Sequence, residues 1–171
     1  MKATAVAFAG VLLLLFTMSC SRNEVSNGDA VKRAMEQADL KDVTVDENRD
    51  KRTITLGGKV HSEDAKQRAG QVAQAAAGNE TIANEISVEP VGSESASRKV
   101  ESNLDDGIES NYKAAIIASG LDKQDISYKA KNGVLTLTGS CKTSGQRQEA
   151  AQLASKVPHV TQVVNTIQVK R

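Results

Sequence analysis

The chain has 171 residues, of which 39% are hydrophobic, 25% charged and 2% aromatic, and its formal net charge at pH 7 is +1. This length suits one ordinary domain or two small ones. Phe8 and Phe16 are its only phenylalanines, and there is no tryptophan. Both phenylalanines lie in the first twenty residues, so the rest of the chain has only Tyr112 and Tyr128 as aromatic residues. This scarcity argues against nucleic acid as a partner, because stacked bases need aromatic platforms.

The N-terminal residues form an export pattern. Lys2 supplies a positive start, and residues 5–16 form an apolar run broken only by one glycine. A membrane-spanning helix needs about 20 apolar residues, so this run is too short to cross a bilayer. Residues 1–19 are therefore predicted to be a secretory signal peptide.

A small residue directly before Cys20 resembles the lipobox of bacterial lipoproteins, although Thr17 stands where that family usually has leucine. The resemblance implies cleavage before Cys20, acylation of this cysteine and a tether over residues 20–28. Acyl chains would anchor the protein to a membrane in the periplasm. Ser21 resembles the residue that directs lipoproteins to the inner leaflet of the outer membrane. The alternative is a plain signal peptide in which the cysteine is incidental.

The rest of the chain contains two copies of one sequence repeat, 81 positions apart. Residues 55–60 recur at 136–141, and residues 84–88 recur at 165–169, with no gap between the two matches. A stretch of small polar residues separates the copies and indicates a linker. The predicted organisation is a first module over residues 29–89, a linker over residues 90–101 and a second module over residues 102–171.

In the first module, apolar residues at helical spacing predict a helix over residues 31–38. Alternating apolar residues predict strands over residues 43–45 and 54–60. Ser62 is placed to cap a second helix, and a last strand is predicted over residues 82–88. The apolar stripe of the second helix consists of Ala65, Ala69, Val72, Ala73 and Ala76.

In the second module, Asn132-Gly133 predicts a tight hairpin turn between the first two strands. The first module has a longer charged loop there. Because a helix separates the second and third strands, these strands are expected to run parallel. The predicted fold class is α+β: two small αββαβ modules, each a three-stranded mixed sheet with two helices on one face.

These motifs resemble the BON domain (bacterial OsmY and nodulation). The first module has Ile-Thr-Leu-x-Gly-x-Val at residues 54–60, an alanine-rich helix, and Ile-x-Asn-x-Ile-x-Val at residues 82–88. The second module repeats the order from residues 132–139 to 160–169, with Cys141 where the pattern has valine. The resemblance implies a role similar to that of periplasmic phospholipid-binding modules that support envelope integrity and osmotic-stress survival.

No pattern in the chain predicts catalysis. His61 and His159 lie at different positions of the two modules, and neither has a partner at zinc-ligand spacing, so both are interpreted as solvated loop histidines. Cys141 replaces Val60, which favours a small buried side chain over a nucleophile paired with His159. The protein is predicted not to be an enzyme and to have no metal or cofactor. The weakest alternative is a hydrolase or a metal-dependent enzyme.

An asparagine recurs in the last strand of each module, as Asn84 and Asn165. Each shares strand parity with apolar residues, so its side chain is expected to point into the module. The expected role is a structural hydrogen bond, and contact with a ligand is the alternative.

The two modules differ in charge. Residues 29–90 contain 9 basic and 12 acidic side chains, whereas residues 104–171 contain 9 basic and 6 acidic ones. Only the second module therefore suits an anionic surface.

The first helix of the second module has more apolar surface than one buried stripe can use. One candidate stripe, aligned with the apolar residues of the first helix, consists of Ala114, Ile117, Ala118 and Leu121. The other consists of Ile108, Tyr112, Ala115 and Ile116. Whichever packs inward, an apolar patch is left beside Lys113. A lipid surface, the first module and a partner protein compete to cover it.

The predicted function is peripheral binding of anionic phospholipid through the second module of a lipid-anchored envelope protein. Tyr112 is amphipathic, as residues at a bilayer interface tend to be, and Lys113, Lys123 or Lys129 could meet lipid phosphates. The predicted phospholipid-binding residues are Ile108, Tyr112, Lys113, Ile116 and Ile117. The alternative function is an interaction scaffold that recruits an envelope or cell-wall protein.

Overall fold

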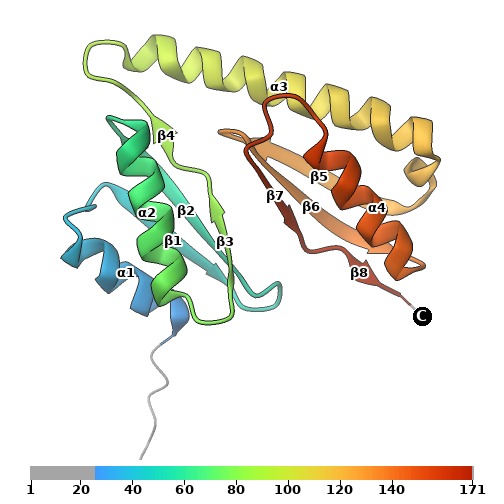
Figure 1. The fold of residues 1–171 in the computed structure, drawn as a ribbon, viewed down its shortest axis with the longest axis horizontal. Coiled ribbons are helices and arrows are strands. Elements are labelled where there is room, and N and C mark those ends of the chain that lie inside the picture. The colour runs from blue at the N-terminus through green and yellow to red at the C-terminus, as the bar shows by residue number, and fades with distance from the viewer. Residues whose placement is uncertain (1–25, 171) are drawn as a thin grey trace, which may run out of the picture.

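The computed structural model describes residues 26–170. The predicted signal peptide and the candidate acylation site Cys20 lie outside these residues. Two modules follow one another along the molecule, and one long helix runs past both of them (Figure 1). No helix within residues 26–170 is both long enough and apolar enough to cross a membrane.

The predicted order of helix, strand, strand, helix and strand is confirmed in both modules, and with it the α+β fold class. The last strand is broken into two short strands in each module. Module 1 contains α1 (Asn27–Gln37), β1 (Val43–Asn48), β2 (Thr53–Val60), α2 (Glu63–Ala76), β3 (Thr81–Asn84) and β4 (Ser87–Val88). Module 2 contains α3 (Glu94–Ser119), the 3₁₀ helix η1 (Leu121–Lys123), β5 (Asp125–Lys131), β6 (Val134–Cys141), α4 (Ser144–Ser155), β7 (Gln162–Asn165) and β8 (Gln168–Val169).

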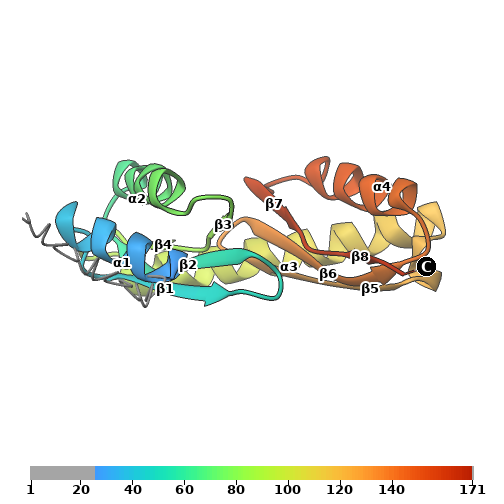
Figure 2. The same cartoon turned by 90° about the horizontal axis from the view of Figure 1, so that it is seen from below.

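Each sheet has its central strand between an antiparallel and a parallel neighbour. β2 pairs antiparallel with β1 and parallel with β3 and β4, and β6 has the same relation to β5, β7 and β8. Ile54 and Leu56 of β2 pack with Val31 and Met35 of α1 in one buried cluster. The helices α2 and α4 lie on the same side of the two sheets (Figure 2).

Local sequence signals place several of these boundaries. The hydroxyl of Ser62 accepts a hydrogen bond from the N–H of Ala65 and caps α2, as predicted. Asn132 and Gly133 have φ values of 49° and 82°. Two successive positive φ values are those of a type I′ turn, so the hairpin prediction is confirmed.

The recurring asparagines make the same hydrogen bond in both modules. The side-chain amide of Asn84 donates to the backbone carbonyl of Lys66 over 2.9 Å, and that of Asn165 donates to the carbonyl of Arg147 over 3.0 Å. Each bond ties the end of a parallel strand to the helix that precedes it. The structural role predicted for Asn84 and Asn165 is confirmed.

The stretch expected to be a linker is helical from Glu94 onward. The carboxylate of Glu101 accepts hydrogen bonds from the N–H of Val88 over 3.0 Å and from the hydroxyl of Ser87 over 2.5 Å. Arg98 forms an ion pair of 3.4 Å with the buried Glu89. The first turns of α3 are therefore attached to module 1, whereas its later turns belong to the core of module 2.

The sheets meet through β3 and β7. The side chain of Gln162 bonds to the strand edge of β3: its oxygen accepts from the N–H of Asn84 over 3.0 Å, and its nitrogen donates to the carbonyl of Ile82. A strand edge needs such partners, because its backbone groups are otherwise open to another chain. A small buried cluster closes this junction and consists of Ala83, Val134 and Val164.

The hairpin turn of module 2 is held by module 1 and by α3. The N–H of Asn132 donates to Asp105 over 2.7 Å, and its side-chain amide donates to the carbonyl of Glu85 over 2.7 Å. Its own carbonyl accepts from the ammonium of Lys66 over 3.1 Å. Asn132 thus joins three elements and fixes module 2 against module 1.

A glycine with positive φ lies at the same place in each central strand. Gly58 has a φ of 88° and Gly139 a φ of 96°. A Cβ added to either would lie 2.1 Å or 2.0 Å from the backbone oxygen of Asp42 or Asp125, respectively. Both the backbone angle and the close approach of the neighbouring strand therefore require glycine.

We predict that Gly139→Ala lowers the free energy of unfolding by at least about 1–3 kcal/mol, because it combines backbone strain with a backbone clash. Chemical denaturation followed by circular dichroism measures this change. Gly145→Ala is the control, since the nearest atom to a Cβ there lies at an ordinary 3.8 Å. Equal unfolding midpoints for the two variants would show that the backbone at Gly139 is not constrained.

Candidate functional site

Three of the five predicted phospholipid-binding residues are in the core of module 2. Ile108, Tyr112 and Ile116 have exposed fractions of 1%, 0% and 5%. They pack against Leu135 and Leu137 of the central strand in one cluster. The expectation that these three side chains form an outward apolar face is therefore wrong, because the sheet of module 2 uses them as its own cover.

The register of α3 explains this outcome. Tyr112 and Ile116 lie 81 positions after Val31 and Met35, the buried residues of α1. The helices therefore follow the same repeat as the central strands. The strand β5 is shifted by two further residues, because Val43 pairs with Gly58 whereas Ile126 pairs with Gly139. Module 2 therefore has two extra residues between α3 and β5, around η1. An alignment that places these two residues before α3 selects the wrong apolar stripe of the helix.

The other two predicted residues remain on the surface. Ile117 is 55% exposed, and Lys113, one turn earlier, is also exposed. They lie on the side of α3 that faces away from the module core. Lys129 is exposed as well, but it is ion-paired with Glu109 over 3.3 Å.

The buried tyrosine is both packed and hydrogen-bonded. The Tyr112 hydroxyl donates to the backbone carbonyl of Ala150 in α4 over 3.1 Å. Its ring meets that of Tyr128 edge to face, with 5.0 Å between the centroids. Burial raises the pKa of Tyr112 above its usual value. These contacts give Tyr112 a structural role, since its polar end is satisfied inside the protein.

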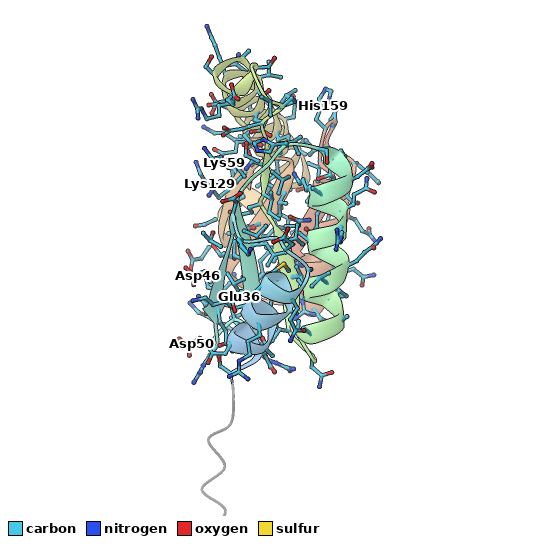
Figure 3. The ribbon with its side chains drawn as sticks, turned by 90° about the vertical axis from the view of Figure 1, so that its left-hand side faces the viewer. Glu36, Asp46, Asp50, Lys59, Lys129 and His159 are labelled. Atoms are coloured by element: carbon cyan, nitrogen blue, oxygen red, sulfur yellow. The ribbon has the colours of Figure 1, made fainter. Side chains whose placement is uncertain are left out.

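The histidines and the described cysteine do not form a reactive pair. Cys141 is 3% exposed and lies at the end of β6, whereas His159 is next to Gly133, just before the start of β6. At about 3.3 Å per residue, the strand separates them by roughly 20 Å or more. His61 and His159 are both exposed, as predicted, and Figure 3 labels His159 on the helix side of the molecule. Within residues 26–170, no group of three or more His, Cys, Asp or Glu side chains is arranged to hold a metal ion.

A groove of about 430 Å³ lies between α3 and the strands of both modules. Most of its carboxylates already have structural partners: for example, Asp105 accepts from Asn132 and Gly133, and Glu109 accepts from the N–H of Ala130. Burial raises the pKa of Glu85, and the neighbouring Lys131 opposes this shift. The groove therefore serves mainly to hold α3 against the two sheets.

A smaller groove lies where the central strand of each module ends. In module 1 it has a volume of about 210 Å³ and includes Val60. Two acidic and two basic side chains line it, so its charge is balanced: Asp39, Asp42, Lys41 and Lys59. Asp39 and Lys41 also form an ion pair of 3.0 Å. We call this the module 1 end groove.

The corresponding groove of module 2 has a volume of about 290 Å³ and includes Cys141, the counterpart of Val60. Three lysines line it, Lys123, Lys142 and Lys170, with Asp125 as the single carboxylate. The contact between Lys170 and Asp125 is 3.8 Å long, and both side chains are more than 70% exposed, so it is a weak ion pair. We call this the module 2 end groove.

The repeat itself could have identified two of these lysines. Lys142 stands where module 1 has His61, and Lys170 stands where it has Glu89. The wider charge difference follows the same direction, because module 1 projects acidic side chains such as Asp46 and Asp50 from its surface (Figure 3). The sequence pattern did not predict the module 2 end groove, because its residues come from segments that are distant in sequence: η1, β6 and the segment after β8.

Two mixed sheets covered by helices, arranged as repeated modules, define the class: a tandem α+β repeat protein. The BON domain family model matches residues 25–90 and residues 104–171. The chain therefore belongs to the BON domain family, with two copies of the domain. BON domains are associated with envelope and osmotic-stress proteins and with phospholipid binding.

Among curated proteins, no match to the chain was found. Among solved structures, the chain is similar to the C-terminal domain of CdsD, a structural protein of the type III secretion system of Chlamydia trachomatis. The identity is 11% and the TM-score 0.36, over 83% of this chain and 96% of that one. A second structure of CdsD has the same identity and TM-score, over 82% of this chain and 90% of that one. A likeness this distant gives no information about function.

We predict that stability falls as the pH rises above about 10, the usual pKa of tyrosine. In the folded state the pKa of Tyr112 is raised, so with rising pH the Tyr112 hydroxyl loses its proton in the unfolded chain before it does in the folded one. The free energy of unfolding therefore falls by up to about 1.4 kcal/mol per pH unit. Tyr112→Phe should remove this part of the pH dependence and cost about 1 kcal/mol at neutral pH. Urea denaturation at several pH values measures both effects.

Tyr128→Phe is the matched control, because Tyr128 is a half-buried tyrosine of the same core. If Tyr112→Phe and the parent protein lost stability equally above pH 10, the Tyr112 hydroxyl could not be protected in the folded state.

Proposed function

We propose that this protein is a non-enzymatic component of the bacterial envelope whose second module binds anionic phospholipid at a membrane surface. The observation that carries the proposal is the difference between the end grooves. Lys123, Lys142 and Lys170 face a single carboxylate in module 2, whereas the charges of the module 1 end groove cancel.

Three lysines from three segments are suited to phosphate headgroups. A lysine close to an anionic bilayer contributes about 1 kcal/mol of attraction. The helix α4 begins beside this groove with a capping box at Thr143, and the partial positive charge of a helix N-terminus adds to the attraction for an anion. Neither Lys123 nor Lys142 forms an ion pair with a carboxylate of residues 26–170.

Exposed apolar side chains accompany these charges. Val169 precedes Lys170 and is 38% exposed, and Ile117 precedes η1 by one turn. Single apolar side chains beside lysines can enter the headgroup region without a large apolar face. Lys113 and Ile117 therefore stay in the proposed contact surface, whereas Ile108, Tyr112 and Ile116 leave it. Support of envelope integrity or osmotic-stress tolerance is the physiological role that we assign to this binding.

The proposal places the protein in the periplasm, anchored through an acylated Cys20 to the inner leaflet of the outer membrane. Acyl chains would keep the chain at a membrane and leave the module 2 end groove to select the surface it contacts. We expect Cys20→Ser to move the protein from the membrane fraction to the soluble fraction of the periplasm. Fractionation with intact-mass analysis measures this, and an unacylated parent protein would contradict the anchor alone.

For the binding itself, we expect residues 21–171, which include all the described residues, to co-sediment with phosphatidylglycerol vesicles and not with phosphatidylcholine vesicles. Lys123→Glu combined with Lys142→Glu should weaken this binding at least about tenfold, because two attractive charges become repulsive. Added salt should weaken the parent protein's binding through screening.

The matched control is Lys41→Glu combined with Lys59→Glu in the module 1 end groove. It changes the net charge equally and should alter binding by no more than about twofold, since only module 2 is proposed to face the membrane. Equal losses for both pairs would mean that overall charge and not the groove determines binding. Absence of binding to anionic vesicles would refute the proposed function.

The second candidate function is an interaction scaffold. The observation that favours it is the exposed side of α3, where Val100 and Leu104 are 56% and 39% exposed. These residues lie in the half of α3 that contacts module 1, away from the module 2 end groove.

A further inference from the structure

The two modules differ at the outer edge of their sheets. In module 2 a side chain of α3 closes part of this edge, because the carboxylate of Glu109 accepts a hydrogen bond from the N–H of Ala130 in β5 over 2.9 Å. In module 1 the position of Ala130 is taken by Glu47 of β1, since both lie opposite the same repeat position of the central strand. The residue of α1 that corresponds to Glu109 is Gly28, 81 positions earlier. A glycine has no side chain with which to close the edge of β1.

The backbone groups of β1 that point away from β2 are open. In an antiparallel pair, alternate residues turn both backbone groups toward the neighbouring strand, and the residues between them turn both away. Val43 belongs to the second set, because its N–H donates to the carbonyl of Leu40 over 3.2 Å. Val45 and Glu47 therefore belong to it as well. Within residues 26–170, β1 pairs with no strand other than β2, and we call the outward groups of Val45 and Glu47 the β1 edge.

An open edge of this kind is a template for another extended chain. Side chains alternate between the two faces of a strand. On the inner face, Val45 is half-buried and packs against the core of module 1. On the outer face, Thr44, Asp46 and Asn48 are exposed. A strand added at the β1 edge would therefore continue the core on one face and meet a carboxylate on the other.

The charge around the β1 edge selects among possible occupants. Residues 39–50 contain five acidic and two basic side chains, and both basic ones already form ion pairs with acidic residues of the same stretch. Asp46 and Asp50 form no ion pair within residues 26–170 and project from module 1 (Figure 3). A second copy of β1 would bring the same carboxylates alongside these, which is unfavourable. Lysine or arginine at alternate positions of an incoming strand would instead be attracted to Asp46.

We propose that the β1 edge binds an extended segment of a partner protein in which lysine or arginine alternates with apolar residues. The segment adds a strand to the sheet of module 1 through backbone hydrogen bonds to Val45 and Glu47. Its apolar side chains lie on the face of Val45, and its basic side chains lie on the face of Asp46. This contact belongs to module 1 and does not depend on the lipid contact proposed for module 2.

A capped peptide of sequence Thr-Lys-Val-Lys-Val-Lys-Thr is the probe, added to isotope-labelled residues 21–171 and followed by NMR. Its sequence reads the same in both directions, so parallel and antiparallel pairing present the same side chains. We expect saturable shifts of the amide signals of Val45 and Glu47, with a dissociation constant on the order of 100 µM. Replacing the lysines of the peptide by glutamate should weaken binding at least about tenfold. Unchanged β1 signals at about ten times that peptide concentration would overturn the proposal.

N-methylation of the peptide tests whether it binds as a strand. Methyl groups on the two valine nitrogens remove the N–H groups that face β1 in antiparallel pairing, and methyl groups on the lysine nitrogens remove those that face it in parallel pairing. One of these two peptides should lose binding, and the other should keep it within about threefold. If both bound as well as the parent peptide, charge alone would hold it, and strand addition would be wrong.

Glu47→Pro and Glu47→Ala form a matched pair of protein variants. Both remove the side chain, but only proline removes the outward N–H, and edge strands tolerate proline where the N–H faces solvent. Glu47→Pro should therefore bind the peptide at least about tenfold more weakly than Glu47→Ala. The amide spectrum outside β1 reports whether the fold is kept. Equal affinities of two folded variants would contradict a backbone contact at the β1 edge.

Charge reversal on the outer face gives a second test that leaves the backbone unchanged. Asp46→Lys should weaken binding of the lysine peptide about five- to tenfold and strengthen binding of the glutamate peptide. Glu149→Lys makes the same charge change on an exposed position of α4 in module 2 and should alter binding by no more than about twofold. Equal effects of the two reversals would show that net charge and not the β1 edge attracts the peptide.

Sedimentation velocity of residues 21–171 without peptide tests the other occupant. We expect a monomer. A dimer that Glu47→Pro converted to a monomer would assign the β1 edge to a second copy and overturn the partner segment. The variant with Lys123→Glu and Lys142→Glu should keep its peptide binding, so this proposal and the lipid-binding proposal can fail separately.

Discussion

The constraint on which this structure depends is that each small sheet has one apolar face and only two helices to cover it. In module 2 that face presents Leu135 and Leu137, and the helix α3 must supply the large side chains that cover them. It does so with Ile108, Tyr112 and Ile116, and Tyr112 also bonds to α4. Once these side chains are committed inward, the rotation of α3 is set, and every other surface of the helix is determined by it.

The same helix then joins the modules. Its first turns bond to β4 through Glu101 and to Glu89 through Arg98, and its middle turns bond to the hairpin of module 2 through Asp105. Asn132 in that hairpin reaches module 1 directly. A side chain that is hydrogen-bonded to backbone groups of another element resists displacement, because breaking the hydrogen bond leaves polar groups unpaired. The two modules are therefore positioned by polar contacts around one small apolar cluster.

Duplication allows the two copies to diverge where the fold does not need their side chains. The half-buried Asn84 and Asn165 keep the same hydrogen bond, and Gly58 and Gly139 keep the same backbone conformation. The end grooves, by contrast, differ in charge, since their side chains are exposed and contribute little to stability. Structural residues are thus shared between the modules, and the candidate site for an anionic surface lies among the residues that are not.

The sequence by itself determined the repeat, the order of elements, the Asn132-Gly133 turn and the structural asparagines, because these depend on local spacing and on the conformations that particular residues allow. It also indicated which module is basic. Only the tertiary structure decided which stripe of α3 is buried, because a two-residue insertion near η1 shifts β5 relative to the helix. It likewise brought together Lys123, Lys142 and Lys170, which are distant in sequence. Helical periodicity shows that a helix has an apolar stripe, but the packing partner selects among competing stripes.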